Sequence, residues 1–463
     1  MPLRALVIDF NSFFASVEQQ ERPELRGQPV GIVQVLADTT GCIAVSIEAK
    51  RAGIKRGMRT VEARRLCPGI RIVKSRPEVY IDYHRRFVDI IESCIHVTKV
   101  QSIDEVTCEL RGSWAEPGKA VAVAKKIKTE IAKRAGECLR SSIGIAPNWL
   151  LAKVASDMQK PDGLVVLNDD DGDIPAKLLH LKPSDISGIG SGVGERLRAR
   201  GVETVEALYA LSMHGMRGIW GGVVGERMWR LLHCEDMPFF EQEGDQSIGH
   251  GKVLPPGRRN NTDALADLHR LLQKAAMRMR DSNLYAGMLH AYVAHGDGSK
   301  WSAELHFNET QDTIALTHAL NELWRRRMAR AGDAKKAPLR IGVMLTRLLR
   351  AEGHTPDLFG AEQEQRSGRL LGAVDEINRV LGRNTVYFGG AHGATAEAPM
   401  RIAFTRIPKP EVEDIDRARQ GRFRPKKQDG CENRGGVENQ GGDENQSGVE
   451  NQSGGENQDG NET

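Results

Sequence analysis

The chain of 463 residues is 40% hydrophobic and 27% charged, and it is longer than one hydrophobic core organises, so we expect about three domains with appendages. It has no run of about 18 uncharged apolar residues and no signal-peptide layout at its N-terminus, which argues against a membrane span or export and predicts a cytoplasmic protein. Its seven cysteines are scattered without a CxxC pair, which argues against a zinc site and a disulfide framework.

The net charge of +3 hides an uneven distribution along the chain. From Gln428 onward there are nine acidic residues and one arginine, so residues 1–427 carry 64 basic and 53 acidic residues, a net charge of +11. This balance suits a polyanionic partner, although a solvated basic face explains most runs of charge.

The first 165 residues have the pattern of an α/β domain. RALVIDF predicts a buried strand, SFFASVEQQ predicts a helix capped by Asn11 or Ser12, and VGIVQV and GCIAVS predict further strands. Val123, Ile127 and Ile131 then follow helical spacing, with lysines on the opposite face.

Residues 166–240 change to short helices broken by glycine. From Ser247 to about residue 350 the pattern is regular again and predicts the order strand, helix, strand, strand, helix, strand. This βαββαβ order is typical of the ferredoxin-like split, a sheet with two helices on one face. Such a fold says little about function by itself.

The last part of the sequence predicts no packed structure. RARQGRFRPKK at 417–427 is a basic linker, and the following segment repeats G-x-E-N-Q at a six-residue step. Val437 and Val449 are its only aliphatic residues, too few to bury a core, so we expect this tail to be disordered.

Two adjacent acids interrupt the strand pattern of VTKVQSIDEVTCEL. In a regular strand Asp104 and Glu105 would point to opposite faces, and one would be buried at a cost of several kcal/mol. A hairpin with its bend at 102–104 and a returning strand at 106–110 lets both carboxylates converge on a divalent cation. A solvated acidic turn is the alternative.

A third acid, Asp9, stands where the first predicted strand ends, and open α/β sheets place ligands at the carboxyl ends of strands. Alternatively, Asp9 is an acid at a helix N-terminus, favoured by the helix dipole. Three carboxylates around two Mg²⁺ ions suit phosphoryl chemistry in either a polymerase or a nuclease.

The segment SGIGSGVGERL at 187–197 resembles a helix-hairpin-helix. Gly188 and Gly190 would let the hairpin approach a DNA phosphate, and the next helix would point its N-terminus at the anion. A plain glycine-rich turn is the alternative. A second glycine-rich turn near Trp220 and Trp229 is a weaker candidate.

Together these motifs carry a family resemblance. DFNSFFASVE, SIDE, SIGIAPNWLLAKVASDMQKPDGL and SGIGSGVGERLRARGV, in this order and spacing, resemble the Y-family translesion DNA polymerases over about residues 1–235. TPDLFG, RSGRLLGAVDEINRVLGRNTVYFGG and RIAFTRIPK resemble the C-terminal part of the UmuC-type branch, the catalytic subunit of DNA polymerase V, and DinB-like features accompany them.

The resemblance implies that the protein adds dNTPs to a primer 3′-OH opposite damaged template, in DNA repair and the SOS response, with two Mg²⁺ ions. It implies roles for a set of residues. The metal ligands are Asp9, the Phe10 carbonyl, Asp104 and Glu105. The dNTP-binding residues are Phe13, Phe14, Lys50 and Lys160, of which Phe14 is the steric gate against a ribose 2′-OH. The DNA-binding residues are Gly188, Gly190 and Gly192.

The implied fold is an α/β multidomain right hand. The palm would comprise residues 1–20 and 75–165, and the fingers would comprise residues 21–74. The helical thumb would follow at 166–240 and the βαββαβ little finger at 245–350. A UmuC-like segment at 351–410 and the linker and tail at 411–463 would complete the chain.

Several positions depart from the family pattern. Asn11 stands where many relatives have a second Asp, Ile47 replaces a tyrosine, and Ala44 replaces a hydroxyl residue. Lys50 replaces an arginine, so it keeps the charge but loses the bidentate fork, and nucleotide affinity would be weaker or differently arranged.

Two further interpretations stay open. The chain could be a catalytically weak or inactive scaffold of the same fold that recruits other polymerases, or a metal-dependent nuclease, which would leave the phenylalanines and Lys160 without a purpose. Expected partners are primer-template DNA and dNTPs, and a UmuD-like subunit and RecA are candidate partners. A sliding clamp is a further candidate, because Leu358 and Phe359 in TPDLF resemble a clamp-binding peptide without its usual Gln. Packing of these two residues on the little finger is the alternative.

Overall fold

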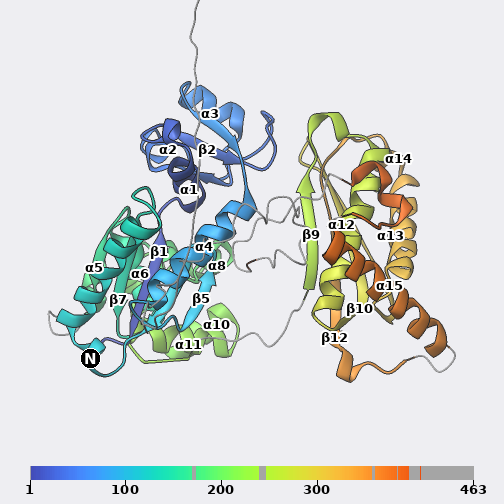
Figure 1. Ribbon diagram of the computed structural model, residues 1–463. Helices are drawn as coiled ribbons and strands as arrows, with labels where there is room; N and C mark the ends of the chain where they lie inside the picture. Colours follow the sequence, from blue (N-terminus) through green and yellow to red (C-terminus); the bar gives the residue numbers. More distant parts are fainter. Residues whose placement is uncertain are drawn as a thin grey trace, which may run out of the picture. The chain divides into compact units, whose positions relative to one another are not determined.

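The computed structural model describes residues 2–168, 174–238, 247–356, 360–382, 384–395 and 407 (Figure 1). In the described part of the chain no helix is long and apolar enough to cross a membrane. The predicted tail and linker lie outside the described residues, as do Leu358 and Phe359.

A five-stranded sheet has the order β5-β6-β1-β7-β8. Its strands are β1 (Ala5–Phe10), β5 (Lys99–Ser102), β6 (Glu105–Glu109), β7 (Ser141–Ala146) and β8 (Leu164–Val166). The central strand β1 is antiparallel to β6 and β7, and all six of its residues are buried. A strand covered on both faces explains the continuous apolar run ALVI before Asp9.

The two faces of β1 lie in two different cores. Leu6, Ile8 and Phe10 pack into a core shared with α4 (Pro77–Glu92) and α5 (Pro117–Arg134), where the predicted stripe of Val123, Ile127 and Ile131 is buried. Ala5 and Val7 pack into a second core with α6 (Trp149–Met158). Because strand residues alternate between faces, Asp9 lies on the same face as Ala5 and Val7, the face that α6 covers.

Helix α6 packs unusually close to β7. A Cβ placed on Gly144 of β7 would lie 2.0 Å from the Ala152 carbonyl oxygen and 2.3 Å from the Ser156 amide nitrogen, so only glycine fits there. Asn148 caps the helix by accepting a hydrogen bond from the Leu151 amide at 3.0 Å. These two contacts fix α6 and the loop after it relative to the central sheet.

Helix α1 (Phe13–Glu21) begins directly after β1, but its predicted cap is wrong in detail. Ser12 occupies the cap position with a left-handed backbone (φ 53°), and its hydroxyl accepts no capping hydrogen bond. The Asn11 side chain turns instead to the sheet, where its Nδ2 donates to Ser142 Oγ at 3.1 Å and its Oδ1 accepts from the Asp162 amide at 2.7 Å.

A smaller three-stranded sheet follows, with the order β3-β2-β4. It consists of β2 (Val30–Val33), β3 (Ala44–Val45) and β4 (Arg71–Lys74), with α2 (Ile47–Arg51) and α3 (Thr60–Leu66) beside it. The Ser46 hydroxyl caps α2 by accepting from the Ala49 amide at 3.2 Å. The predicted strands at 30–35 and 41–46 are present but shorter than expected.

The glycine-rich region forms short helices, as predicted. They are α7 (Ile174–Leu178), α8 (Ser191–Arg198), α9 (Val205–Tyr209), α10 (Met213–Trp220) and α11 (Val223–Leu232), with a 3₁₀ turn η3 (Pro183–Asp185) before α8. Their apolar residues share the second core with α6. Asn148 also donates from Nδ2 to the Leu231 carbonyl at 2.8 Å, which ties α11 to the start of α6.

The predicted βαββαβ order is confirmed beyond residue 247. It comprises β9 (Ser247–Val253), α12 (Asn261–Asp281), β10 (Leu284–His295), β11 (Lys300–Thr310), α13 (Thr313–Met328) and β12 (Pro338–Arg350), with the short helix α14 (Ala331–Ala334) before β12. The sheet order is β11-β10-β12-β9, and every neighbouring pair is antiparallel. In each βαβ unit, one other strand therefore lies between the two strands that the helix connects. Helices α12 and α13 share one hydrophobic core with the sheet.

The 3₁₀ turn η6 (Gly389–Ala394) packs on α12, and the helix α15 (Ala361–Leu381) is joined to α12 by an ion pair. Arg280 of α12 holds Asp375 of α15 through two parallel hydrogen bonds of 2.7 and 2.9 Å. Gln273 Nε2 donates to the Phe388 carbonyl at 3.2 Å. The segment after the four-stranded sheet thus belongs to the same packing unit as α12.

Candidate active site

The three predicted acids meet at the end of β1. The register of β1 and β6 places Asp9 directly opposite Glu105, and the Phe10 amide donates to the Asp104 carbonyl at 2.9 Å. The Ser102 hydroxyl donates to Asp104 Oδ1 at 2.6 Å inside the turn between β5 and β6. The predicted hairpin is confirmed, although β6 already begins at Glu105.

Burial makes this a costly place for negative charge. Burial is the largest cause that raises the pKa of Asp104. The charge of Asp9 raises this pKa further, and the hydrogen bond from the Ser102 hydroxyl lowers it in part. Burial also raises the pKa of Glu105, against the opposing effect of Lys153. Carboxylates gathered in a low-dielectric site require nearby cations to remain ionised.

Two lysines supply those cations from α6 and the loop after it. Lys153 Nζ forms ion pairs with Asp9 Oδ2, with Glu105 Oε2 at 3.0 Å and with Asp157 Oδ1 at 3.4 Å. Lys160 Nζ lies 2.7 Å from Asp9 Oδ1 and 2.7 Å from Asp157 Oδ1. Burial opposes the charge of Lys153, but the three acids together raise its pKa above the ordinary value.

These ion pairs shape what the carboxylates can bind. Within the described residues, no three His, Cys, Asp or Glu side chains are gathered as they would be around one metal ion. Asp9 and Glu105 instead turn their oxygens to lysine. The donors at this end of β1 are nevertheless all carboxylate oxygens, the ligand type that hard divalent cations such as Mg²⁺ prefer.

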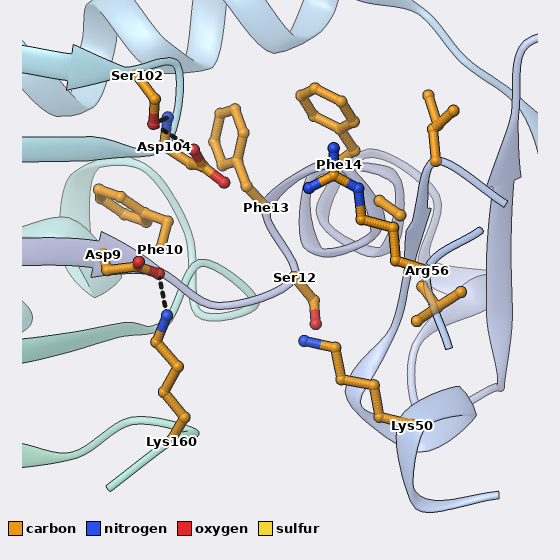
Figure 2. A pocket seen from close by; sticks show the side chains of 13 residues that line it. Asp9, Phe10, Ser12, Phe13, Phe14, Lys50, Arg56, Ser102, Asp104 and Lys160 are labelled. Carbon is orange, nitrogen blue, oxygen red and sulfur yellow. Dashed lines mark hydrogen bonds and ion pairs between the residues drawn. The ribbon is translucent and has the colours of Figure 1, made fainter. Parts of the chain in front are cut away.

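A pocket of about 390 Å³ opens between the end of β1 and the small sheet (Figure 2). Asp9, Asp104 and Lys160 lie on one side, and Phe14 and Arg56 lie on the other. Its lining comprises Asp9, Phe10, Ser12, Phe13, Phe14, Ile43, Ala44, Val45, Lys50, Arg56, Ser102, Asp104 and Lys160. The pocket thus combines two acids, three basic side chains and an aromatic wall.

The aromatic wall is held from behind. The Phe14 ring stacks on Tyr80 of α4, with centroids 4.4 Å apart, and Phe13 packs edge-on against Phe87 at 5.7 Å. The Tyr80 hydroxyl donates to Glu18 Oε1 at 2.8 Å, and Arg76 forms an ion pair with Glu18 at 2.7 Å. Phe14 is therefore a rigid wall of the pocket, because its neighbours are fixed by buried hydrogen bonds.

Comparison with known proteins bears on this arrangement. Residues 8–157 match the impB/mucB/samB family and residues 245–358 match the impB/mucB/samB family C-terminal domain. DNA polymerase IV of Moorella thermoacetica is 32% identical over 397 residues, which cover 82% of this chain and 94% of that protein. DNA polymerase IV 1 of Bacillus subtilis is 29% identical over 294 residues, covering 63% of this chain and 70% of that protein.

The chain belongs to the Y family of DNA polymerases. A Y-family DNA polymerase chimera of Dbh and Dpo4 has the same fold, with a TM-score of 0.64 and 24% identity over 75% of this chain and 99% of the other. The right-hand architecture with a separate C-terminal sheet domain, the little finger, is thereby confirmed. The protein is a DNA-directed DNA polymerase, a nucleotidyltransferase of translesion synthesis and DNA repair.

The branch within the Y family differs from expectation. The two relatives above are named DNA polymerase IV, which gives no support to the UmuC-type assignment drawn from the C-terminal motifs. Much of that resemblance falls on residues outside the described ranges, including Leu358, Phe359 and the segment RIAFTR at 401–406. The motifs at 366–390 correspond to α15 and the turn after it.

This Y-family polymerase brings most of the predicted site residues together. Asp9, Phe10, Phe13, Phe14, Lys50, Asp104 and Lys160 line the pocket, and Glu105 adjoins it through its pairing with Asp9. Lys50 is the predicted cation on α2, and burial together with the charge of Lys160 lowers its pKa.

The three predicted DNA-binding glycines lie apart from this pocket, at the start of α8. Gly188 has a positive φ of 90°, Gly190 is the N-cap residue and Gly192 lies in the first turn of α8. A Cβ on Gly188 would approach the Met228 methyl group to 2.8 Å, so α11 packs directly behind the hairpin. The expected hairpin before a helix is present, with the 3₁₀ turn η3 as its first arm.

Three residues of the Y-family site were not predicted from the sequence. Lys153 and Asp157 flank the carboxylates, and Arg56 lines the pocket beside Phe14 (Figure 2). The spacing of Lys153 and Asp157 was a usable signal, because residues four apart lie on one side of a helix. Arg56 follows α2 in a loop, where no periodicity marks it.

Proposed function

We propose that this polymerase transfers a nucleotide from a dNTP to the primer 3′-OH at the end of β1. One observation carries the proposal: the register of β1 and β6 sets Asp9 against Glu105 beside the turn that holds Asp104, next to a pocket with an aromatic wall and three basic side chains. A nuclease needs the acids but has no use for the wall or for the basic side chains.

Asp9, Asp104 and Glu105 would hold the divalent ions, two Mg²⁺ in our proposal, and the Phe10 carbonyl is a candidate further ligand. Their oxygens suit Mg²⁺, and their burial favours bound cations. When bound, the ions activate the attacking hydroxyl and stabilise charge on the phosphates. The β1–β6 pairing and the Ser102 hydroxyl hold the acids in place before any ion arrives.

Lys160, Lys50 and Arg56 would bind the triphosphate, because they present positive charge to one pocket of suitable volume. Arg56 is positioned to supply the planar fork that Lys50 lacks. Phe14, held against Tyr80, would exclude a ribose 2′-OH, and Phe13 would lie under the nucleotide.

We assign the five-stranded sheet with α4, α5 and α6 to the palm and the three-stranded sheet to the fingers. Helices α7–α11 would form the thumb, whose Gly188–Gly190 hairpin and α8 N-terminus, with Gly192, would contact a DNA phosphate. The four-stranded sheet, as little finger, would complete the grip on primer-template DNA. An excess of positive charge over residues 1–427 supports a DNA partner.

We further propose a DNA polymerase IV type of translesion enzyme that extends primers without a UmuD-like subunit or RecA. Similarity to a DNA polymerase IV over 94% of that protein's length supports this choice. Adding a UmuD-like protein and RecA to a primer-extension assay tests it, because a requirement for either would restore the UmuC-type assignment. Leu358 and Phe359 are candidate anchors for a sliding clamp, and clamp stimulation of a double alanine variant tests that role.

The decisive experiment for catalysis is Asp104→Asn, which keeps the size of the side chain and removes its charge. We expect primer extension to fall by at least about 10³-fold, as when a charge-stabilising group is removed from an active site. DNA affinity should stay within about twofold, because the acid faces metal rather than DNA.

Glu24→Gln, a change at an exposed acid in the turn η1 (Pro23–Leu25), serves as the matched control and should extend primers normally. Full activity in Asp104→Asn would refute the assignment of the site. Equal loss of DNA binding and extension would indicate that Asp104 maintains the fold or the DNA grip.

A further inference from the structure

Lys153 lies in the centre of the acidic cluster, and the polymerase mechanism above gives it no role. Its Nζ pairs with Asp9 and with Glu105 at 3.0 Å, so it bridges the two acids that face each other across β1 and β6. The side chains of all three residues are less than one-fifth exposed. The cluster is therefore largely buried and differs in kind from a solvated surface ion pair.

The oxygens that Lys153 contacts are the ones we assign to divalent ions. Asp9 Oδ2 and Glu105 Oε2 face the ammonium directly. A divalent ion bound to the same oxygens would be close to the ammonium, and two cations so close repel each other strongly at low dielectric. Lys153 and the ion therefore exclude each other from these oxygens.

The helix offers the displaced ammonium another partner. Asp157 is four residues further along α6, its Oδ1 is already 3.4 Å from Lys153 Nζ, and its side chain is 36% exposed. Its present close partner is Lys160 at 2.7 Å, a residue that we assign to the triphosphate. A carboxylate has two oxygens, so Asp157 can receive Lys153 beside Lys160, and the four-carbon stem of Lys153 has the necessary freedom. Departure of Lys160 toward a nucleotide would then leave Asp157 wholly to Lys153.

We propose that Lys153 is a built-in counter-cation that holds Asp9 and Glu105 in position until divalent ions bind, and then moves to Asp157. It is a positioning residue and touches no substrate. The inference rests on the proposed function, because it takes these acids as the metal ligands. It predicts that the charge of Lys153 stabilises the metal-free protein and weakens the binding of the ions.

The test uses the full chain with Mn²⁺ as the probe, without DNA or nucleotide. In Lys153→Met the melting temperature in EDTA should fall, because Glu105 loses its counter-charge and Asp9 keeps only that of Lys160. Mn²⁺ affinity, measured by calorimetry, should rise about fivefold or more, which is the lower range of typical site coupling. Lys126→Met, at an exposed position of α5, is the matched control and should change neither quantity.

Asp157→Asn removes the second partner, so Mn²⁺ affinity should fall, and this fall should disappear in the double variant Lys153→Met with Asp157→Asn. Unchanged or weaker Mn²⁺ binding in Lys153→Met would overturn the inference. The variant Asp104→Asn distinguishes the assignment of the metal ligands from the role of Lys153. If it binds Mn²⁺ as well as the native protein, the metal assignment itself fails, whereas loss of binding there with no effect of Lys153→Met refutes only the role of Lys153.

Discussion

Phe14 owes its fixed position to a chain of contacts that begins at Arg76, the residue before α4. Its ring is 4% exposed and stacks on Tyr80, which the buried Glu18 holds through a hydrogen bond. Arg76 neutralises Glu18. The wall that we propose Phe14 forms against the sugar of a nucleotide must not yield, and this chain of contacts keeps the ring from turning aside.

Phe14→Leu should weaken the selection against ribonucleotides. The smaller side chain opens the pocket near the sugar, so the ratio of kcat/KM for dNTP over rNTP should fall by about tenfold or more. Leucine is preferable to alanine, because loss of a buried ring costs about 3–5 kcal/mol and would confound the result. Primer extension with matched dCTP and CTP measures the ratio, and an unchanged ratio would move the gate to Phe13.

The burial of His84 predicts that stability depends on pH near neutrality. His84 is 5% exposed, its Nδ1–H donates to the Ile103 carbonyl at 2.9 Å, and its ring packs edge-on against Phe87. Burial lowers its pKa in the folded state below the ordinary value of about 6.5, more than the hydrogen bond raises it. The unfolded chain therefore takes up a proton below about pH 6.5 that the folded protein resists.

The free energy of unfolding should accordingly decrease as the pH falls from about 7 to about 5.5, because protonation of His84 favours the unfolded chain. In His84→Asn, which can still donate to Ile103, the decrease over this range should be smaller. Urea unfolding at several pH values measures it. The exposed His96, substituted in the same way, is the control, and equal slopes in native protein and His84→Asn would contradict the assignment.

At the scale of residues, the sequence could predict those site residues that a pattern in their immediate sequence neighbours marks. Asp9 ends an apolar run and Asp104 stands in a turn, so strand periodicity and turn chemistry indicated both. Lys153 carries only its four-residue spacing from Asp157, which does not place it at the site, because its importance depends on the packing of α6 against β7 that Gly144 permits. The capping role of Ser12 was predicted wrongly, because the turn into α1 is set by the Asn11 contacts with Ser142 and Asp162.

At the scale of elements, α6 is the part on which the site depends most. It supplies Lys153 and Asp157 and leads directly to Lys160, and its distance from the sheet is set by Gly144. A helix this close to a strand has no room for even a methyl group.

Gly144→Ala should therefore push α6 away from β7. We expect a loss of about 1–3 kcal/mol in stability, as for overpacked cores, together with reduced primer extension. Gly372→Ala is the matched control. Its added Cβ meets nothing within 4 Å in the middle of α15, so it should stabilise by about 0.5–1 kcal/mol. Thermal unfolding of both variants decides, and a neutral Gly144→Ala would show that α6 can shift freely.

At the scale of the whole molecule, the charge of the chain is divided between a basic body and an acidic tail. Deleting residues 428–463 should leave primer extension and melting temperature unchanged at physiological salt, because this sequence offers only Val437 and Val449 as aliphatic side chains to a core. A fall in either quantity on deletion would show that the tail docks. The measurement compares the primer extension and melting temperature of a variant that ends at residue 427 with those of the full chain.

The order of regions along the molecule was predictable, and the branch of the family was not. Alternating and helical periodicities give element order directly, as in the βαββαβ region beyond residue 247. Branch membership depends on a few C-terminal motifs, and overall similarity to DNA polymerase IV outweighs them. That β10 and β12 form the middle of the little-finger sheet was likewise set by the long-range pairing of β12 with β9 and β10.

The register of β1 and β6 sets Asp9 opposite Glu105, 96 residues away in the chain, and Lys153 bridges the two carboxylates. Substitutions in β1 or β6 leave that alignment intact, but inserting or deleting one residue turns every later side chain of the strand to the other face. For evolution and for library design this makes two short windows, 5–10 and 105–109, intolerant of length change even where they tolerate a change of residue. Length variation among functional descendants should accumulate instead in the connecting segments, such as 34–40 between β2 and β3, which carry none of the three acids at the end of β1.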